Sequence, residues 1–155
     1  MTFGAAQAAL REQFGRSKKP AKVFRYRDSE HEPTIRRHLT KYSWDEVPLE
    51  GIAELWTSDA WGSVSIEAKH YYAPGILLSV LEGSVTAQTL DYVGAMLDTF
   101  EFSIRDSDSG LFAYSTEQLK ALVIAQDSIQ RRYDHGMHGS FYERILVQFG
   151  GNQQS

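Results

Sequence analysis

The chain of 155 residues contains no cysteine. Disulfide bonds, zinc–thiolate centres, iron–sulfur clusters and cysteine nucleophiles are therefore excluded. Long apolar runs are also missing. The longest run covers residues 76–78 and then Val80 and Leu81, far fewer than the ~20 residues of a membrane-spanning helix. The first ten residues hold no basic stretch before an apolar one, so we expect no secretory signal. These absences predict a cytoplasmic protein without a membrane partner.

Motifs that would assign a reaction are missing as well. The sequence holds no phosphate-binding glycine loop, no dinucleotide fingerprint, no zinc-protease motif and no Gly-x-Ser-x-Gly. No catalytic residue can be named, and we expect no cofactor. Serines gather between Ser58 and Ser65, but without a recognisable partner histidine and carboxylate.

Metal-binding patterns are weak. The stretch 106–110 (DSDSG) is similar to the start of a calcium loop, but Leu111 stands where such a loop needs glycine, which favours a solvated loop. His135 and His138 are the closest histidine pair, and the glycines around them favour a turn over a metal site. His31 and His38 are interpreted as surface residues. We therefore expect no metal.

Charge is unevenly distributed along the chain. Residues 1–44 contain ten Lys or Arg and four Asp or Glu, a net +6, and residues 45–155 carry −10, which together give the overall −4. We expect that Arg25, Arg27, Arg36 or Arg37 meets carboxylates of the acidic part. The alternative is an anionic partner, with the rings of Phe24 and Tyr26, which alternate with Arg25 and Arg27, stacking on bases. The negative total makes nucleic-acid binding the less favoured interpretation.

Apolar residues recur at helical spacing along most of the chain. The expected helices begin near Phe3, Pro33, Pro48, Ser65, Pro74, Thr86, Ser115 and Ser140. Ser115 and Ser140 open capping boxes, and Pro74 either starts a new helix or kinks one longer helix. The strand candidates, 23–27 and 102–104, are short. The sequence thus predicts a mainly α fold: one compact domain of about seven or eight helices over residues 1–149, at most a minor β-pairing, and a flexible polar tail at 150–155.

Three patches together resemble a known family. They are Trp44-Asp45-Glu46-Val47-Pro48, the stretch Ser65-Ile66-Glu67-Ala68-Lys69-His70-Tyr71-Tyr72-Ala73-Pro74, and Tyr114-Ser115-Thr116-Glu117-Gln118. Their order and spacing are similar to those of a mostly bacterial family described only as a domain of unknown function. The resemblance covers about residues 5–130 and implies a single helical domain, without catalytic residues or a ligand. Ile66 and Ala73 depart from the family pattern, which often has proline and a larger apolar residue at these positions.

Aromatic residues supply the candidate binding site. Tyr71 and Tyr72 are neighbours on a helix and point about 100° apart, so one ring is expected in the core and the other towards the Trp44 loop or a cleft. The main interpretation is packing, with each hydroxyl bonded to the backbone. The functional interpretation is a pocket that is lined by Trp44, Tyr71 or Tyr72, and Trp56 or Trp61.

Two functions of different classes follow. The first is a non-enzymatic domain that binds a protein partner, binds itself or acts as an accessory protein, with its charge asymmetry orienting the partner. The alternative is a small-ligand-binding protein or an enzyme with an aromatic cleft near Trp44 and Tyr71/Tyr72. A pocket with convergent polar groups would favour the second, and a flat exposed apolar patch the first.

Overall fold

The computed structural model describes residues 3–25, 30–105 and 114–133, with the backbone alone for 98–105. The α-helices of these residues are α1 (Phe3–Phe14), α2 (Glu32–Ile35), α3 (Ile52–Thr57), α4 (Ile66–Glu82), α5 (Ala87–Arg105) and α6 (Thr116–Arg132). Between them lie a π-helical turn, η1 (Arg36–Thr40), and the 3₁₀ turns η2 (Trp44–Glu46), η3 (Leu49–Gly51) and η4 (Ala60–Ser63). The mainly α fold is confirmed, and the described residues hold six α-helices, slightly fewer than the seven or eight expected for the chain. The helix expected at Ser140 lies outside the described residues.

Side-chain caps start the long helices where the sequence predicts them. The hydroxyl of Ser65 accepts from the backbone N–H of Ala68, and the hydroxyl of Thr86 accepts from that of Thr89. Ser115 and Gln118 form the full capping box of α6, in which each side chain accepts from the other residue's backbone N–H. These bonds satisfy amide donors that a helix leaves open in its first turn.

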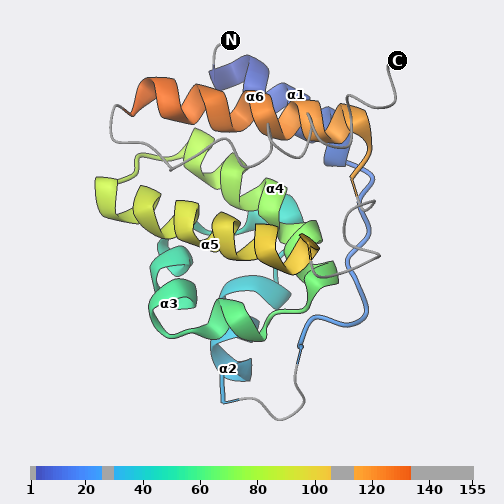
Figure 1. The fold of residues 1–155 in the computed structure, drawn as a ribbon, viewed down its shortest axis with the longest axis vertical. Helices are drawn as coiled ribbons and strands as arrows, with labels where there is room; N and C mark the ends of the chain where they lie inside the picture. Colours follow the sequence, from blue (N-terminus) through green and yellow to red (C-terminus); the bar gives the residue numbers. More distant parts are fainter. Residues whose placement is uncertain (1–2, 26–29, 106–113, 134–155) are drawn as a thin grey trace.

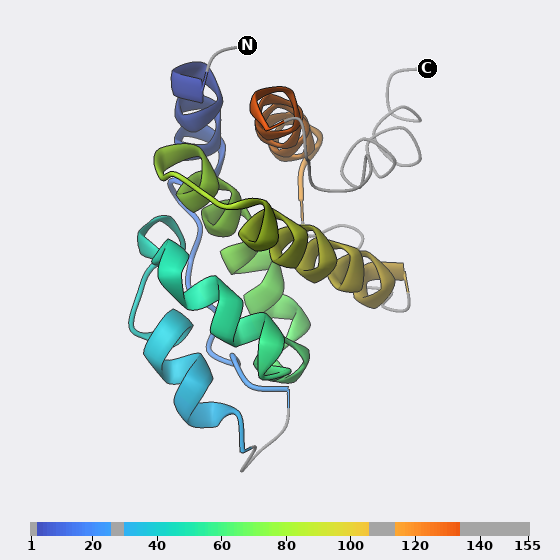
Figure 2. The same cartoon turned by 90° about the vertical axis from the view of Figure 1, so that its left-hand side faces the viewer.

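Helix α4 is the centre of the molecule. It contacts α1, α5, α6 and η2, and thirteen of its 17 residues are buried. Figure 1 shows α1 and α6 side by side at one end of the molecule and α2 and α3 at the other. In the turned view of Figure 2, α4 runs between these two ends. Helices from the start and the end of the described chain therefore enclose one shared core.

Pro74 lies inside α4, so of the two expected alternatives the single longer helix forms and a new helix does not begin at Pro74. Proline lacks the N–H that would bond the carbonyl four residues earlier, here that of His70. The hydroxyl of Tyr114 donates to that carbonyl over 2.8 Å. The helix continues through the proline because a side chain from outside α4 replaces the missing donor.

One predicted strand segment forms the expected minor β-pairing, and the other does not. Phe24 and Val64 form an isolated antiparallel bridge, in which Arg25 N donates to Ser63 O and Ser65 N donates to Val23 O, both over 2.7 Å. Residues 102–104 belong to α5 instead of a strand. The described residues contain no helix with the length and apolar character needed to cross a membrane.

Candidate functional site

The structure brings Trp44, Tyr71 and Tyr72 together. The backbone N–H of Trp44 donates to the hydroxyl of Tyr71 over 3.2 Å, and the two tyrosine rings meet edge to face with centroids 4.8 Å apart. Both tyrosines are buried, at 9% and 0% exposure. The expected arrangement is present, because Tyr72 lies in the core and Tyr71 is directed towards the Trp44 segment and a pocket. They point in different directions because neighbouring helix positions do so.

Tyr72 is bonded through its hydroxyl to the backbone of another segment. Its hydroxyl lies 3.0 Å from the carbonyl oxygens of both Leu39 and Tyr42, to which it donates. Burial raises the pKa of Tyr72 well above its ordinary value of 10.0, with a further contribution from Tyr71, so the hydroxyl keeps its proton. Tyr72 therefore ties α4 to η1 and to the residues just after it, and its hydroxyl is not available to a ligand.

Trp61 and Trp56 lie apart from this cluster. The indole N–H of Trp61 donates to the carbonyl of Met96 over 3.1 Å, and the ring is fully buried. Trp56 is partly buried against the core. Neither lines the pocket described next.

Tyr71 lines an open pocket of about 190 Å³. Its apolar wall comes from Phe14, Tyr71 and Tyr114, with the imidazole of His70 beside them, and its polar lining comes from Ser17, Lys18, Glu67 and Gln118. These residues belong to the end of α1, the segment after it, the first half of α4 and the start of α6. The aromatic cleft expected near Tyr71 thus exists, but Trp44, Tyr72, Trp56 and Trp61 do not line it.

Four rings form a continuous aromatic row along this pocket. The ring of Trp44 contacts Phe14 at 5.9 Å between centroids, Phe14 contacts Tyr114 edge to face at 5.8 Å, and Tyr114 contacts His70 at 4.7 Å. Such tilted and edge-to-face pairs are favourable beyond the area they bury. Trp44 therefore supports the pocket wall from behind.

The remaining contacts hold this wall in place. The side chain of Gln118 closes the α6 capping box and also donates to the carbonyl of Gln13 over 3.1 Å, which joins α6 to the end of α1. Gly75 brings η2 close to α4, because a Cβ there would lie 1.6 Å from the carbonyl oxygen of Trp44. Ser79 donates to the carbonyl of Val47, which fixes the other end of this segment.

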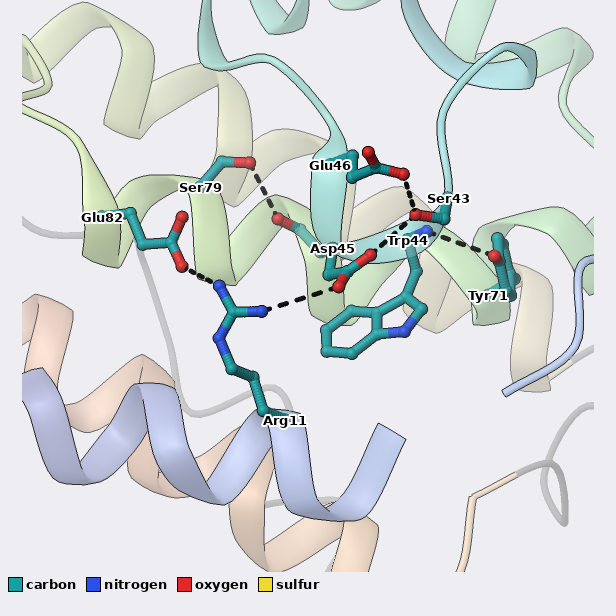
Figure 3. A network of polar contacts seen from close by, with 9 residues as sticks. Arg11, Ser43, Trp44, Asp45, Glu46, Tyr71, Ser79 and Glu82 are labelled. Carbon is teal, nitrogen blue, oxygen red and sulfur yellow. Dashed lines mark hydrogen bonds and ion pairs between the residues drawn. The ribbon is translucent and has the colours of Figure 1, made fainter. Parts of the chain in front are cut away.

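A network of polar contacts joins α1, η2 and α4 and fixes η2 between the two helices (Figure 3). Arg11 pairs with Asp45 at 3.6 Å and with Glu82. The hydroxyl of Ser43 donates to Asp45 over 2.7 Å and also contacts Glu46. These groups are largely satisfied by each other, so we assign the network to positioning Trp44 and not to chemistry.

The electrostatics of the pocket are mixed. Burial lowers the pKa of His70 from 6.5 to about 4, against the opposing effect of the Glu67 charge, so the imidazole is neutral at neutral pH. Lys18 and Glu67 are exposed at the pocket. Among the described residues, neither forms an ion pair, with the other or with a third group. The pocket is thus lined by one basic and one acidic residue beside a neutral aromatic wall.

Sequence reasoning missed His70, Glu67 and Lys18 as site residues. One signal was available: Lys69 and His70 are polar residues inside a helix whose other positions from Ala68 to Leu78 are apolar or aromatic. Lys69 is 1% exposed and lies 5.5 Å from the face of the Trp61 ring. Burial and the nearby Arg25 lower the pKa of Lys69 from 10.5 to about 8.

The basic segment meets the acidic part at one of the expected arginines. Arg37 pairs with Glu54 at 3.1 Å, whereas Arg36 pairs with Glu32 of its own segment, with 2.9 Å between Nε and the carboxylate. His38 was expected to be a surface residue, and this expectation is wrong. Its Nε2 lies 2.5 Å from the Glu54 carboxylate, and its side chain is only 14% exposed. The contact with His38 holds the pKa of Glu54 below its ordinary value.

Other candidates fall outside the described residues. These are Arg27, the acidic stretch 106–110 and the histidine pair at 135 and 138. Within residues 3–25, 30–105 and 114–133, no three His, Asp or Glu side chains gather as a metal site would need.

Comparison with protein-family models, with curated proteins and with solved structures finds no match to this chain. The resemblance that the three sequence patches indicate therefore stays a prediction. Functional conclusions depend on the geometry of the pocket.

Proposed function

We propose that the protein binds a small molecule in the pocket between α1, α4 and the start of α6. The observation that carries this proposal is the convergence of an aromatic wall with Lys18 and Glu67 at one pocket. Ligand sites commonly combine apolar walls with a few polar groups that fix the orientation of the ligand. The alternative function that the sequence predicts is therefore the one that the geometry favours.

The size of the pocket supports a compact ligand. Drug-sized pockets measure roughly 300–1,000 Å³, and this one measures about 190 Å³. In liquid water each molecule occupies about 30 Å³, so the pocket holds about as much as six water molecules. A metabolite with a single ring or a short branched chain is of this size.

The chemistry of the pocket supports binding better than proton transfer. A general base works best when its pKa lies near the working pH, and the pKa of His70 is about 4. The hydroxyl of Tyr114 donates to the His70 carbonyl, and both ends of the Gln118 side chain are bonded within the fold. The residues of the wall thus stabilise the shape of the pocket.

A protein partner remains the other expectation from the sequence. The pocket is open to solvent, so a side chain of a partner could occupy it in place of a free molecule. The cytoplasmic location, the bacterial origin and the role as an accessory protein also stay predictions.

The proposal is tested by nuclear magnetic resonance with a panel of small soluble amines, acids and amino acids that carry one ring. We expect at least one of them to cause saturable shifts in the signals of His70, Tyr71 and Tyr114. The variant Ser17→Phe fills the pocket from its rim and should abolish these shifts. The matched control is Ala21→Phe, because Ala21 is exposed on the same segment and does not line the pocket. A panel without any saturable shift at the pocket would overturn the proposal.

A further inference from the structure

We propose that the ligand of this pocket is a zwitterion of the α-amino-acid class with an apolar or aromatic side chain. This inference rests on the proposed function and specifies its substrate class. In the arrangement we infer, Lys18 contacts the carboxylate of the ligand, Glu67 contacts its ammonium group, and the aromatic row contacts its side chain.

The first argument comes from the two charges. Several charged side chains of the described residues form ion pairs within the fold, such as Arg37 with Glu54 and Lys120 with Glu117. Lys18 and Glu67 line the same small pocket, and no ion pair joins them. Two opposite charges that share a pocket without neutralising each other match a ligand that carries both charges.

The second argument comes from the position of these charges. Lys18 belongs to the segment that follows α1, and Glu67 lies in the first turn of α4. The fold, and not one local motif, therefore places the two charges at one opening. A ligand with a single charge would satisfy one of them and bring the other near an apolar body, which costs solvation.

The third argument comes from the wall between the charges. Phe14 is 3% exposed and Tyr71 is 9% exposed, and both line the pocket, so the core holds each ring in place and each offers a ligand a small apolar area. Rings of this kind pack favourably against an apolar or aromatic side chain in tilted geometry. The neutral imidazole of His70 adds no third charge at neutral pH.

The experiment compares three compounds that differ only in their charged groups. They are L-phenylalanine, 2-phenylethylamine, which lacks the carboxylate, and 3-phenylpropionate, which lacks the ammonium group. Binding is measured by titration with observation of the His70 and Tyr114 signals. We expect L-phenylalanine to bind about tenfold more tightly than either of the others, which is typical of one charge-assisted contact.

Variants of the two charged residues assign the contacts. Lys18→Ala should remove the preference of the protein for L-phenylalanine over 2-phenylethylamine and leave its preference over 3-phenylpropionate. Glu67→Gln should do the reverse. Lys22→Ala is the matched control for the first, because Lys22 is exposed on the same segment outside the pocket. Glu117→Gln is the control for the second, because Glu117 is exposed at the same position of α6 that Glu67 has in α4.

The outcomes separate this inference from the proposed function. Equal binding of all three compounds, abolished by Ser17→Phe, would overturn the zwitterion and leave a small-molecule pocket. Binding of one singly charged compound in preference to the amino acid would also overturn it. If none of the three compounds binds but another member of the panel shifts the pocket signals, the zwitterion fails and the binding pocket stands. If no compound of the panel binds, both fail.

Discussion

At the scale of single residues, Lys69 is the least expected feature of the core. A lysine that is 1% exposed has lost its hydration, and in the described residues its closest compensation is the face of Trp61. A cation over an indole ring recovers part of that loss. The presence of Arg25 nearby acts in the opposite direction.

Replacing Lys69 with methionine should stabilise the protein at pH 7. In the folded chain Lys69 releases its proton near pH 8, whereas in the unfolded chain it keeps it up to about 10.5. Between these pH values the unfolded state binds more protons, so the stability that Lys69 contributes rises with pH. The difference between the two pKa values corresponds to about 3 kcal/mol of unfolding free energy, which the charged Lys69 costs the folded protein at pH 7. Urea unfolding of Lys69→Met and of the unmodified protein should therefore show a difference in unfolding free energy at pH 7 that closes above pH 10.5. A gap that does not change with pH would show that the amine is well solvated.

His70 should make the protein sensitive to acid. The folded pKa of His70 is about 4 and the ordinary value is 6.5, so between these values the unfolded chain binds the extra proton and stability falls as pH falls. Above pH 6.5 the imidazole is neutral in both states and contributes no such dependence. The variant His70→Phe keeps a ring against Tyr114 but has no group that titrates in this range. Between pH 6.5 and pH 4 its free energy of unfolding should therefore fall by about 3 kcal/mol less than that of the unmodified protein. Parallel acid profiles of the two proteins would contradict this.

At the scale of helices, α4 is held together by partners outside itself. Helix interiors tolerate proline poorly, with a cost of about 3 kcal/mol. Here the hydroxyl of Tyr114 replaces the donor that Pro74 lacks. The two residues are thus coupled, although they are far apart in the sequence.

A double-mutant cycle should measure this coupling. Tyr114→Phe alone leaves the buried His70 carbonyl without this donor and should cost about 1–3 kcal/mol. In a Pro74→Ala background the restored backbone N–H can bond the same carbonyl, so the same change should cost clearly less. Denaturant unfolding of the four proteins gives the coupling energy. Equal costs in both backgrounds would mean that the Tyr114 hydroxyl does not compensate for Pro74.

Gly75 is required by the close approach of η2 and not by helix chemistry. Replacing a glycine inside a helix with alanine usually stabilises it by about 0.5–1 kcal/mol. Gly75→Ala should instead destabilise the protein, because the new Cβ would meet the backbone oxygen of Trp44 at 1.6 Å. Gly4→Ala in α1 is the control, since nothing lies within 4 Å of a Cβ there, and it should be neutral or stabilising. Thermal unfolding of the two variants tests the difference, and a stabilised Gly75→Ala would show that η2 yields easily.

The sequence predicts an element well where the signal lies within the element itself, and poorly where the element depends on a contact with another segment. Caps and apolar spacing are local, so α1, α5 and α6 begin where they were expected. Local signals left open whether α4 continues through Pro74, because the choice depends on a hydroxyl from another segment. Residues 102–104 resemble a strand only when they are read apart from the helix that contains them. In the site, Tyr71 was found by its aromatic character, whereas Lys18 and Glu67 gained their meaning only when the fold placed them at one pocket.

At the scale of the whole molecule, the uneven charge of the sequence is partly neutralised inside the fold. Arg11 pairs with Asp45 and Glu82, and Arg37 pairs with Glu54, so basic residues of the first 44 positions contact carboxylates of the remainder. The partners are substantially exposed, and such pairs contribute ~1 kcal/mol or less each. They orient the segments more than they stabilise them.

The same pairing limits binding to nucleic acid. Of the basic side chains, Lys19 donates to the carbonyl of Thr40, and the paired arginines would have to exchange a carboxylate for a phosphate. Few cations are left for phosphates, while the protein as a whole carries −4. We therefore expect a dissociation constant weaker than about 1 μM for single-stranded DNA or RNA at physiological salt, in the range of non-specific binding.

Fluorescence anisotropy with a labelled oligonucleotide at two salt concentrations measures this directly. Each phosphate that the protein neutralises adds about −0.7 to the logarithmic salt slope for a single strand. In the exposed segment after α1, Arg16, Lys18 and Lys22 have neither an ion pair nor a side-chain hydrogen bond to another described residue, whereas Lys19 donates to the Thr40 carbonyl. With these three cations, a slope steeper than about −2 would need further cations. Submicromolar binding with such a slope would mean that the basic segment is directed at an anionic polymer. In that case the aromatic row beside Lys18 would have to be considered as a surface for stacking bases, and the amino-acid ligand would lose its main support.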